Sequence, residues 1–250
     1  MLRAGELAAV AAEFGVSDAQ VRRDHLISHL LAALSRDVRE VVVFFGGTAL
    51  SRTHLPAGRL SEDVDLLAVG ARRPAAEAVQ STLADGVRRE FGRLTWTPTL
   101  TAVRDTDPAV VATADGLGVR VQLLSPVGWP AWPTEERDLV QRYSDAPPAR
   151  LRVPTLPAFA AMKTTAWGDR KAARDLYDLH LLAGVGGIGP AAGALYARHG
   201  PSGRPPPAWL FDAVPTAEQW QDQLGGQTRL SVGPEEAAAT VRAAWARAVA

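Results

Sequence analysis

Two carboxylates, Asp63 and Asp65, stand two residues apart in the chain, and the turn-forming sequence Gly46-Gly47-Thr48 precedes them. Side chains at i and i+2 of a strand point to the same face of a sheet. Two carboxylates held together are costly unless a cation neutralises them, and oxygen ligands suit Mg²⁺. Glycines let backbone N–H groups approach a phosphate, and the Thr48 hydroxyl adds a donor. The combination indicates phosphoryl chemistry, with Asp63 and Asp65 as magnesium ligands.

The elements around these motifs are predicted from the pattern of apolar residues. Apolar runs predict one strand before the glycines, at residues 41–45, and a second strand at residues 64–69. The two carboxylates lie at the start of the second strand. Both motifs then lie where a sheet can bring them together. Further along, we expect a helix over residues 74–91, a weak strand within 94–103, and a hairpin of 110–114 with 119–124 around Asp115-Gly116.

Two helices are expected before the sheet, at residues 3–14 and from Asp18 to about Ser35. Ser17 is a good N-cap for the second helix, which carries leucines at helical spacing. His25 and His29 lie four residues apart on it, a spacing that can bind a metal. No further ligand is nearby in the sequence, so the histidines alone do not predict a metal site.

Residues 126–157 are rich in proline and mark the expected boundary between a sheet domain and a helical domain. We therefore predict an N-terminal domain of residues 1–150, with helices and sheet, and a helical domain of residues 151–250. The helices expected in the second domain are 157–167 and 169–183, separated near Gly168, followed by 190–199, 216–224 and 234–249.

The motifs together resemble the DNA polymerase beta type of nucleotidyltransferase, and more narrowly the AbiEii/AbiGii toxin family with its MenT-type members. The first matching block is Gly46–Ser51 followed by Arg59-x-Ser61-x-Asp63-Val64-Asp65. The second block consists of Lys163, Arg170 and the segment Arg174–Leu179. The resemblance implies a mixed α/β (α+β) fold, in which a polymerase-beta-type sheet domain precedes a C-terminal helical domain.

The resemblance also implies an activity and a set of partners. A toxin of this type transfers a nucleoside monophosphate from a nucleoside triphosphate (NTP) to an RNA acceptor, here expected to be the 3′ end of tRNA. It needs Mg²⁺, and a cognate antitoxin restrains it. On this basis Asp63, Asp65, Lys163 and Asp178 are the expected catalytic residues. Those expected to bind nucleotide or orient its phosphates are Gly46, Gly47, Thr48, Arg59, Ser61 and Asp175.

One position departs from the pattern of the superfamily, which usually supplies a third carboxylate from a later strand. In this chain the expected position is Gln122, an amide that cannot take a proton from the attacking hydroxyl at neutral pH. Three explanations remain open: the acceptor is activated otherwise, the register differs and Asp115 serves, or catalysis is impaired.

Two other functions are compatible with the same motifs. The acceptor could be a small cationic molecule such as an aminoglycoside, held by Glu62, Asp105 and Asp107. A degenerate fold could instead bind nucleotide or a partner protein without turnover, as Gln122 would favour. For an RNA acceptor, the basic residues that could contact phosphates form two groups: Arg170, Lys171 and Arg174, and Arg72, Arg73, Arg88, Arg89 and Arg93.

Composition narrows the class of protein. The chain has 27 basic and 27 acidic residues, so contact with nucleic acid requires a local basic patch rather than net charge. It has no cysteine, which excludes disulfides, a thiolate nucleophile and a cysteine-ligated zinc. It has no apolar run of membrane-spanning length and no signal-peptide pattern, so we expect a soluble cytoplasmic protein.

Overall fold

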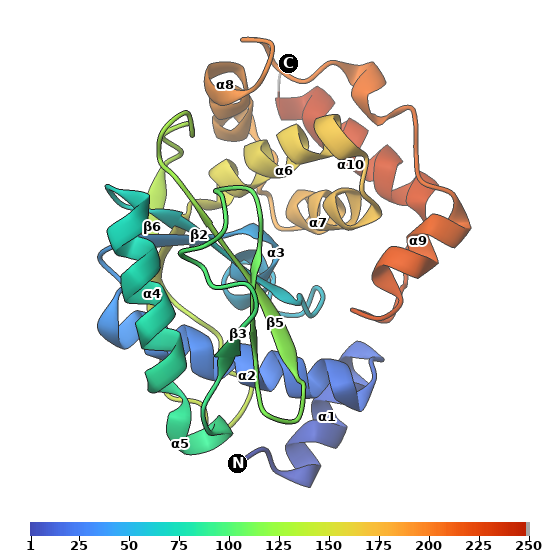
Figure 1. The fold of residues 1–250 in the computed structure, drawn as a ribbon. Coiled ribbons are helices and arrows are strands. Elements are labelled where there is room, and N and C mark those ends of the chain that lie inside the picture. The colour runs from blue at the N-terminus through green and yellow to red at the C-terminus, as the bar shows by residue number, and fades with distance from the viewer. Residues whose placement is uncertain (249–250) are drawn as a thin grey trace. The chain divides into compact units, whose positions relative to one another are not determined.

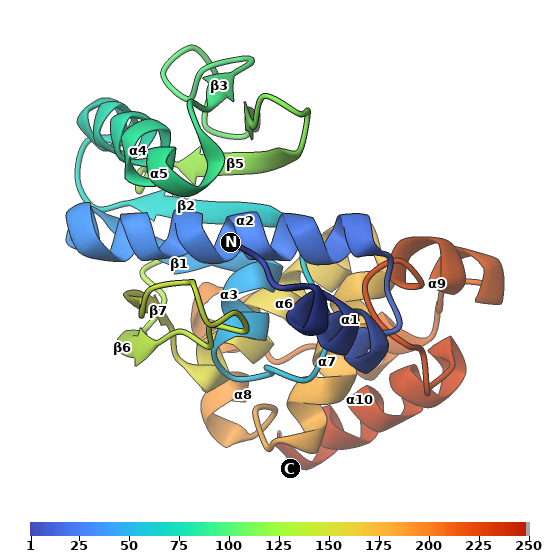
Figure 2. The ribbon, with the colours of Figure 1, turned by 90° about the horizontal axis from the view of Figure 1, so that it is seen from below.

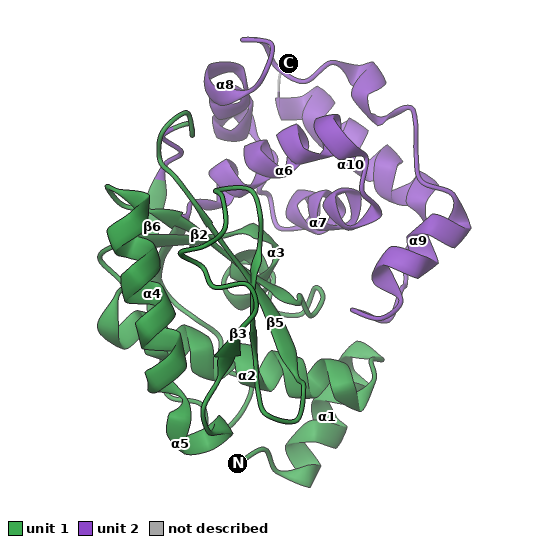
Figure 3. Ribbon diagram, in the orientation of Figure 1, with its two compact units in different colours: residues 1–130, 134–153 green, residues 131–133, 154–250 purple. Residues whose placement is uncertain are grey.

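In the computed structural model, which describes residues 1–248, the chain divides into two units (Figure 3). The sheet unit comprises residues 1–130 and 134–153, and the helical unit comprises residues 131–133 and those from 154 onward. The chain thus passes between the units after residues 130, 133 and 153. None of the helices in the described part is long and apolar enough to cross a membrane.

A five-stranded sheet in the order β1-β2-β5-β4-β3 organises the sheet unit (Figure 1). Only β2 and β5 run parallel, and their neighbours pair antiparallel. Residues along β2 alternate between half-buried and buried, as a strand with one face toward the core requires. The five strands of this sheet are β1 (Val42–Phe45), β2 (Asp63–Ala68), β3 (Thr95–Trp96), β4 (Ala109–Ala112) and β5 (Gly118–Leu124).

Five helices accompany the sheet: α1 (Ala4–Phe14), α2 (Asp18–Asp37), α3 (Gly46–Arg52), α4 (Arg72–Gly86) and α5 (Arg88–Phe91). The long helix α2, blue in Figure 2, begins where predicted, because the Ser17 hydroxyl accepts a hydrogen bond from the Gln20 amide at 3.3 Å. Its predicted apolar stripe is fully buried. α2 contacts both α4 and β5, so these helices and the sheet share one core.

Some predicted elements of the sheet unit were wrong. The helix expected at 74–91 breaks into α4 and α5 at Val87, next to Gly86, where a Cβ would lie 2.6 Å from the Cβ of Ala33 on α2. Within 94–103 only the two residues of β3 form a strand. The proline-rich passage contains an unpredicted two-stranded sheet of β6 (Thr134–Asp138) and β7 (Arg150–Pro154).

The helical unit contains α6 (Leu156–Arg170), α7 (Ala173–Gly184), α8 (Pro190–His199), the 3-10 helix η1 (Ala208–Phe211), α9 (Ala217–Leu224) and α10 (Pro234–Ala248). The break between α6 and α7 falls at Lys171 rather than near Gly168, which stays helical. Lys171 adopts the left-handed conformation at φ 50°. Its ammonium group donates to the Leu210 carbonyl at 2.6 Å and lies 4.7 Å from the Trp167 ring centroid. Residue 249, predicted to end the last helix, lies outside the described residues.

Candidate active site

Asp65 and Gly46 meet where β1 passes into α3. Phe45 is opposite Asp65 in the antiparallel register of β1 and β2, so the next residue, Gly46, lies against the Asp65 side chain. A Cβ at Gly46 would overlap Asp65 Oδ2, and Gly46 has a φ of 77°, which L side chains rarely adopt. Only glycine therefore lets the backbone come this close to the carboxylate.

Arg59 and Ser61 lie against the second glycine. A Cβ at Gly47 would be 2.6 Å from Arg59 Nη2 and 3.0 Å from Ser61 Oγ. Both side chains come from the segment that leads into β2, and both are buried. The two residues that the motif places before the carboxylates thus line the glycine turn itself.

Thr48 links α3 to β2. Its buried hydroxyl donates a short hydrogen bond to the backbone carbonyl of Asp63. In this structure the hydroxyl therefore fixes the turn to β2, and its proton is not available for a hydrogen bond to a phosphate. The first four backbone N–H groups of an α-helix have no acceptor within the helix. Since α3 begins at Gly46, these amides are the donors available for a phosphate.

Asp63 is paired with an arginine that sequence analysis did not single out. Arg120 lies opposite Asp63 in the parallel register of β2 and β5. Its Nε and Nη2 each donate to one Asp63 oxygen at 2.8 Å, a two-bond fork. Hydrogen bonding to Asp63 raises the pKa of Arg120, and the charges of Asp63, Glu62 and Asp65 act in the same direction. The guanidinium group therefore lies within a field of several carboxylates.

Gln122 occupies the position next to Asp65. The register pairs Asp65 with Gln122, as the expected third-carboxylate position requires. Gln122 donates its amide to the Thr106 carbonyl at 2.6 Å. Asp115, the alternative acid, lies in the turn between β4 and β5, where its carboxylate accepts a short hydrogen bond from Thr113. The register therefore excludes Asp115 as the residue opposite Asp65.

In the helical unit, Lys163 lies between two aspartates. Its Nζ is 3.0 Å from Asp175 Oδ1 and 2.6 Å from Asp178 Oδ2, and all three side chains are buried. Arg170 donates two hydrogen bonds to the same Asp175 carboxylate, with Nε 2.7 Å from Oδ2 and Nη2 2.9 Å from Oδ1. The second motif block therefore closes into one cluster of two cations and two anions that joins α6 to α7.

The charges of this cluster determine the titration of Asp175. Burial alone would raise the pKa of Asp175, but the charge of Lys163 and the hydrogen bonds and charge of Arg170 outweigh it. The pKa therefore lies well below its usual range, and Asp175 stays ionised at neutral pH. Of the basic face expected at 170–174, Arg170 is paired with Asp175 while its side chain stays half exposed, and Lys171 donates to the Leu210 carbonyl.

A second buried network fixes the far end of α3. Arg52 is fully buried and donates to Asp24 Oδ1 of α2 at 2.8 Å, and Tyr143 donates to Asp24 Oδ2 at 2.9 Å. Burial, followed by the charge of Arg52, lowers the pKa of the neighbouring Arg142 to about 10. The only sequence signal for this network was Asp24, an acid on the apolar face of a helix. Its partners lie far away in the chain.

Comparison with known proteins places the chain in a family. A family model described as "Nucleotidyl transferase AbiEii toxin, Type IV TA system" matches residues 29–247. The chain belongs to the AbiEii nucleotidyltransferase toxin family. It is therefore a nucleotidyltransferase, and membership in a toxin–antitoxin family implies an NTP substrate and an antitoxin partner. Nucleotidyltransferases generally use a divalent metal ion.

Solved structures agree with this assignment. MenT4, a nucleotidyltransferase toxin from Mycobacterium tuberculosis H37Rv, is similar over 96% of this chain and 88% of its own, with a TM-score of 0.70 and 25% identity. Two structures from Helicobacter pylori share the fold. JHP933 has a TM-score of 0.55 at 16% identity and covers 92% of both chains. A putative nucleotidyltransferase has a TM-score of 0.52 at 17% identity and covers 92% of this chain and 95% of its own.

The comparisons confirm the family and the mixed α/β fold that the motifs predicted. No match was found among curated proteins. The assignment of this AbiEii-family chain therefore rests on the family model and on structural likeness, and the roles of single residues are proposals.

Proposed function

We propose that this AbiEii-family enzyme transfers a nucleoside monophosphate from an NTP to the 3′ end of tRNA, with Mg²⁺, in the cytoplasm. Asp63 and Asp65 are the metal ligands. The observation that carries the proposal is the contact of Gly46 with Asp65. This contact puts the carboxylate beside the turn whose backbone amides can bind a phosphate.

The residues at this position suit Mg²⁺. Mg²⁺ prefers carboxylate oxygens and is usually bound through one or two carboxylates together with substrate phosphates. Asp63 and Asp65 provide such a donor set from one face of β2, and Gly46 lets the Asp65 carboxylate lie directly against the turn. When bound, Mg²⁺ neutralises phosphate charge that develops during transfer.

In the proposed reaction the oxygen of the terminal tRNA hydroxyl attacks the α-phosphorus of the NTP. The new P–O bond forms as the bond to the β-phosphate breaks, pyrophosphate leaves, and the hydroxyl proton passes to solvent. Gln122 does not take that proton. Phosphoryl-transfer transition states are loose and need positioning and charge neutralisation more than a base, so the loss of the third carboxylate is compatible with activity.

The protein side of this chemistry is positioning. The amides at the start of α3 hold the triphosphate, and Arg59 and Ser61 pack against the turn at Gly47. Thr48 fixes the turn to β2 through the Asp63 carbonyl. In the helical unit we assign Lys163 to the triphosphate. Asp178 orients its ammonium group, and Asp175 holds it jointly with Arg170.

Charge pairing favours RNA over a small cationic acceptor. Two of the three acids considered for a cationic molecule are paired: Arg72 Nε lies 2.9 Å from Asp105, and Arg23 Nη1 lies 3.6 Å from Glu62. By contrast, the arginines in and beside α5 are exposed and suit phosphate contacts: Arg88, Arg89 and Arg93.

The acceptor is tested by incubating purified enzyme with Mg²⁺, each α-³²P-labelled NTP in turn, and one acceptor per reaction. We expect label on total tRNA and none on tRNA whose 3′-terminal ribose was oxidised with periodate, because oxidation removes the attacking hydroxyl. Asp63→Asn should label neither. Label on periodate-treated tRNA, or on an aminoglycoside in place of tRNA, would overturn the proposed acceptor.

A further inference from the structure

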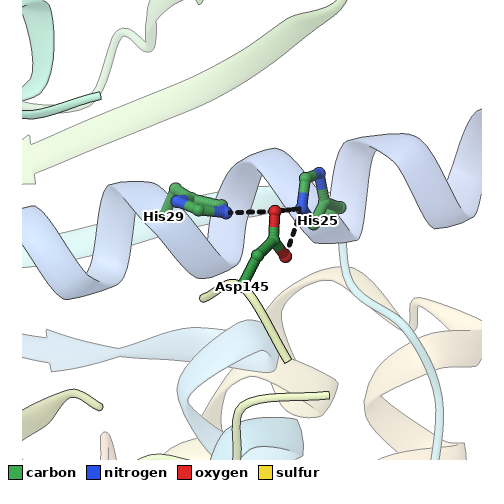
Figure 4. Close-up of side chains that lie close together, drawn as sticks. All are labelled: His25, His29 and Asp145. Carbon is green, nitrogen blue, oxygen red and sulfur yellow. Dashed lines mark hydrogen bonds and ion pairs between the residues drawn. The ribbon is translucent and has the colours of Figure 1, made fainter. Parts of the chain in front are cut away.

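A second group of ligand-type side chains lies on α2, apart from the glycine turn and β2. His25 and His29 project from the same face of the helix, and Asp145, from the segment between β6 and β7, lies between their rings (Figure 4). The carboxylate is 120 residues from His25 in the chain, so no local spacing reveals it. One nitrogen from each histidine and one oxygen from Asp145 all lie within 4.8 Å of one another.

The distances between these atoms approach those around a metal ion. His25 Nε2 lies 3.0 Å and 3.1 Å from the two Asp145 oxygens, and His29 Nε2 lies 3.6 Å from Oδ2. Ligand atoms at about 2.0–2.1 Å from a tetrahedral Zn²⁺ are about 3.3 Å apart. The three donors span up to 4.8 Å, so changes in side-chain rotamer that move the donor atoms by about 1–1.5 Å would bring them onto one ion.

One ligand atom makes a long ion pair but no hydrogen bond. His29 Nε2 is buried and makes no hydrogen bond among the described residues, although it points at Asp145 (Figure 4). A buried polar atom without a hydrogen bond costs about 1–3 kcal/mol, and a contact of 3.6 Å offsets only part of that cost. A metal ion at this position would satisfy it.

The surroundings already attract a cation. The ammonium group of Met1 lies 2.5 Å from Asp145 Oδ2, and Glu90 adds a further negative charge near His29. The side chain of Met1 is fully exposed, so its segment can move away from Asp145. Phe91 packs against both imidazole rings, with centroid distances of 5.4 Å and 5.3 Å, and excludes water from that side.

We propose that His25, His29 and Asp145 form a site for a transition-metal ion of the Zn²⁺ class, distinct from the magnesium ligands proposed on β2. Two imidazole nitrogens select Zn²⁺ or Co²⁺ over Mg²⁺, and histidines at i and i+4 of one helix turn are a known zinc geometry. Water completes the coordination at Asp145, which is one-fifth exposed. The ion ties the β6–β7 connection to α2 and stabilises the fold.

The test uses untagged protein carrying Asp65→Asn, so that zinc binding on β2 is suppressed, after treatment with a chelator. Titration calorimetry should give one Zn²⁺ per chain, and Co²⁺ should give the visible absorption of a tetrahedral site with nitrogen ligands. At a free zinc concentration of about a hundred times the dissociation constant, the unfolding midpoint should rise by about 5–10 °C. These readouts do not depend on transferase activity.

Variants assign the ion to these residues. His29→Gln and Asp145→Asn should each abolish the cobalt spectrum and the thermal shift, whereas His199→Gln, on α8 of the helical unit, should change neither. Near-ultraviolet circular dichroism in chelator establishes that each variant is folded. The proposal is overturned if the Asp65→Asn protein binds neither ion at one per chain, or if the folded His29→Gln variant binds as the parent does.

Discussion

At Gly46 the carboxylate of Asp65 occupies the space that a Cβ atom would take. Gly46→Ala must therefore displace Asp65, and we expect transfer to fall by about 10²-fold or more, the scale of losing an electrostatic contributor. Gly70→Ala is the matched control: Gly70 has a φ of 87°, but nothing lies within 4 Å of its Cβ position. It should lose stability for the same backbone reason and keep its activity.

The two glycine variants are compared by transfer rate and by urea unfolding. Equal losses of activity in both variants would show that backbone strain, rather than contact with Asp65, controls the reaction.

With Asp63 as a metal ligand, as proposed, Arg120 would compete with the ion for its carboxylate. Arg120→Gln removes the guanidinium group that holds both Asp63 oxygens. An exposed ion pair is worth at most about 1 kcal/mol, so we expect the Mg²⁺ concentration for half-maximal transfer to fall by up to about fivefold. A magnesium titration of the transfer rate measures this. A higher magnesium requirement in Arg120→Gln would mean that Arg120 positions Asp63 for the metal instead.

Asp175 makes the stability of the helical unit depend on pH. Its folded-state pKa lies below the unfolded value of about 3.9, so its contribution is present above about pH 4 and is lost as the pH falls through the folded-state pKa. Asp175→Asn should be less stable than wild type at pH 7, and the difference should shrink at pH 3. Urea unfolding at the two pH values measures it. A difference that does not depend on pH would contradict this assignment.

At the scale of elements, α3 is held at both ends. Thr48 fixes its start to β2, and Arg52 fixes its end to Asp24 of α2. Removing one partner of a buried ion pair costs about 3–5 kcal/mol, so Arg52→Met should lower the free energy of unfolding by that amount. Arg36→Met, which breaks an exposed pair with Asp37, should cost less than about 1 kcal/mol. Equal costs in denaturant unfolding would contradict the anchoring of α3.

The elements that carry the first motif could be predicted from the sequence because their signals are local. Apolar runs located β1 and β2 to within a residue, and the turn residues Asp115-Gly116 located the β4–β5 hairpin. The strands β6 and β7 escaped prediction because Thr134–Asp138 is almost wholly polar and Arg150–Pro154 lies among prolines. The first therefore lacks the apolar alternation of a half-buried strand, and in the second Leu151 and Val153 alternate with arginines over too few residues to stand out.

Partners that are distant in the chain could not be predicted in this way. The sequence placed Gln122 on the strand beside Asp65, but the fork between Arg120 and Asp63 depends on the register of two strands. Likewise, His25 and His29 were visible as a helical pair, while Asp145 joins them only through tertiary structure. The break of α6 at Lys171 was missed because a lysine at positive φ gives no sequence signal, whereas glycine does.

At the scale of the whole molecule, family membership predicts toxicity. Induced expression without an antitoxin should arrest growth, because with the proposed acceptor the modified tRNA ends cannot be aminoacylated. Asp65→Asn, expressed at the same level, should not arrest it. Colony counts after induction, with protein levels checked by immunoblot, measure the effect. Arrest by both proteins would show that toxicity does not depend on nucleotidyl transfer.

Asp65, as the proposed metal-binding carboxylate, is the residue on which nucleotidyl transfer to tRNA should depend most. The most direct measurement is the rate of label transfer from an α-³²P-labelled NTP to tRNA, with pyrophosphate release followed in parallel. The comparison is between wild type, Asp65→Asn and a control variant, Asp138→Asn, which replaces an exposed aspartate on β6. We predict one pyrophosphate per labelled tRNA in wild type and Asp138→Asn, and a loss of at least about 10²–10³-fold in Asp65→Asn. Transfer at the wild-type rate by folded Asp65→Asn would contradict the account.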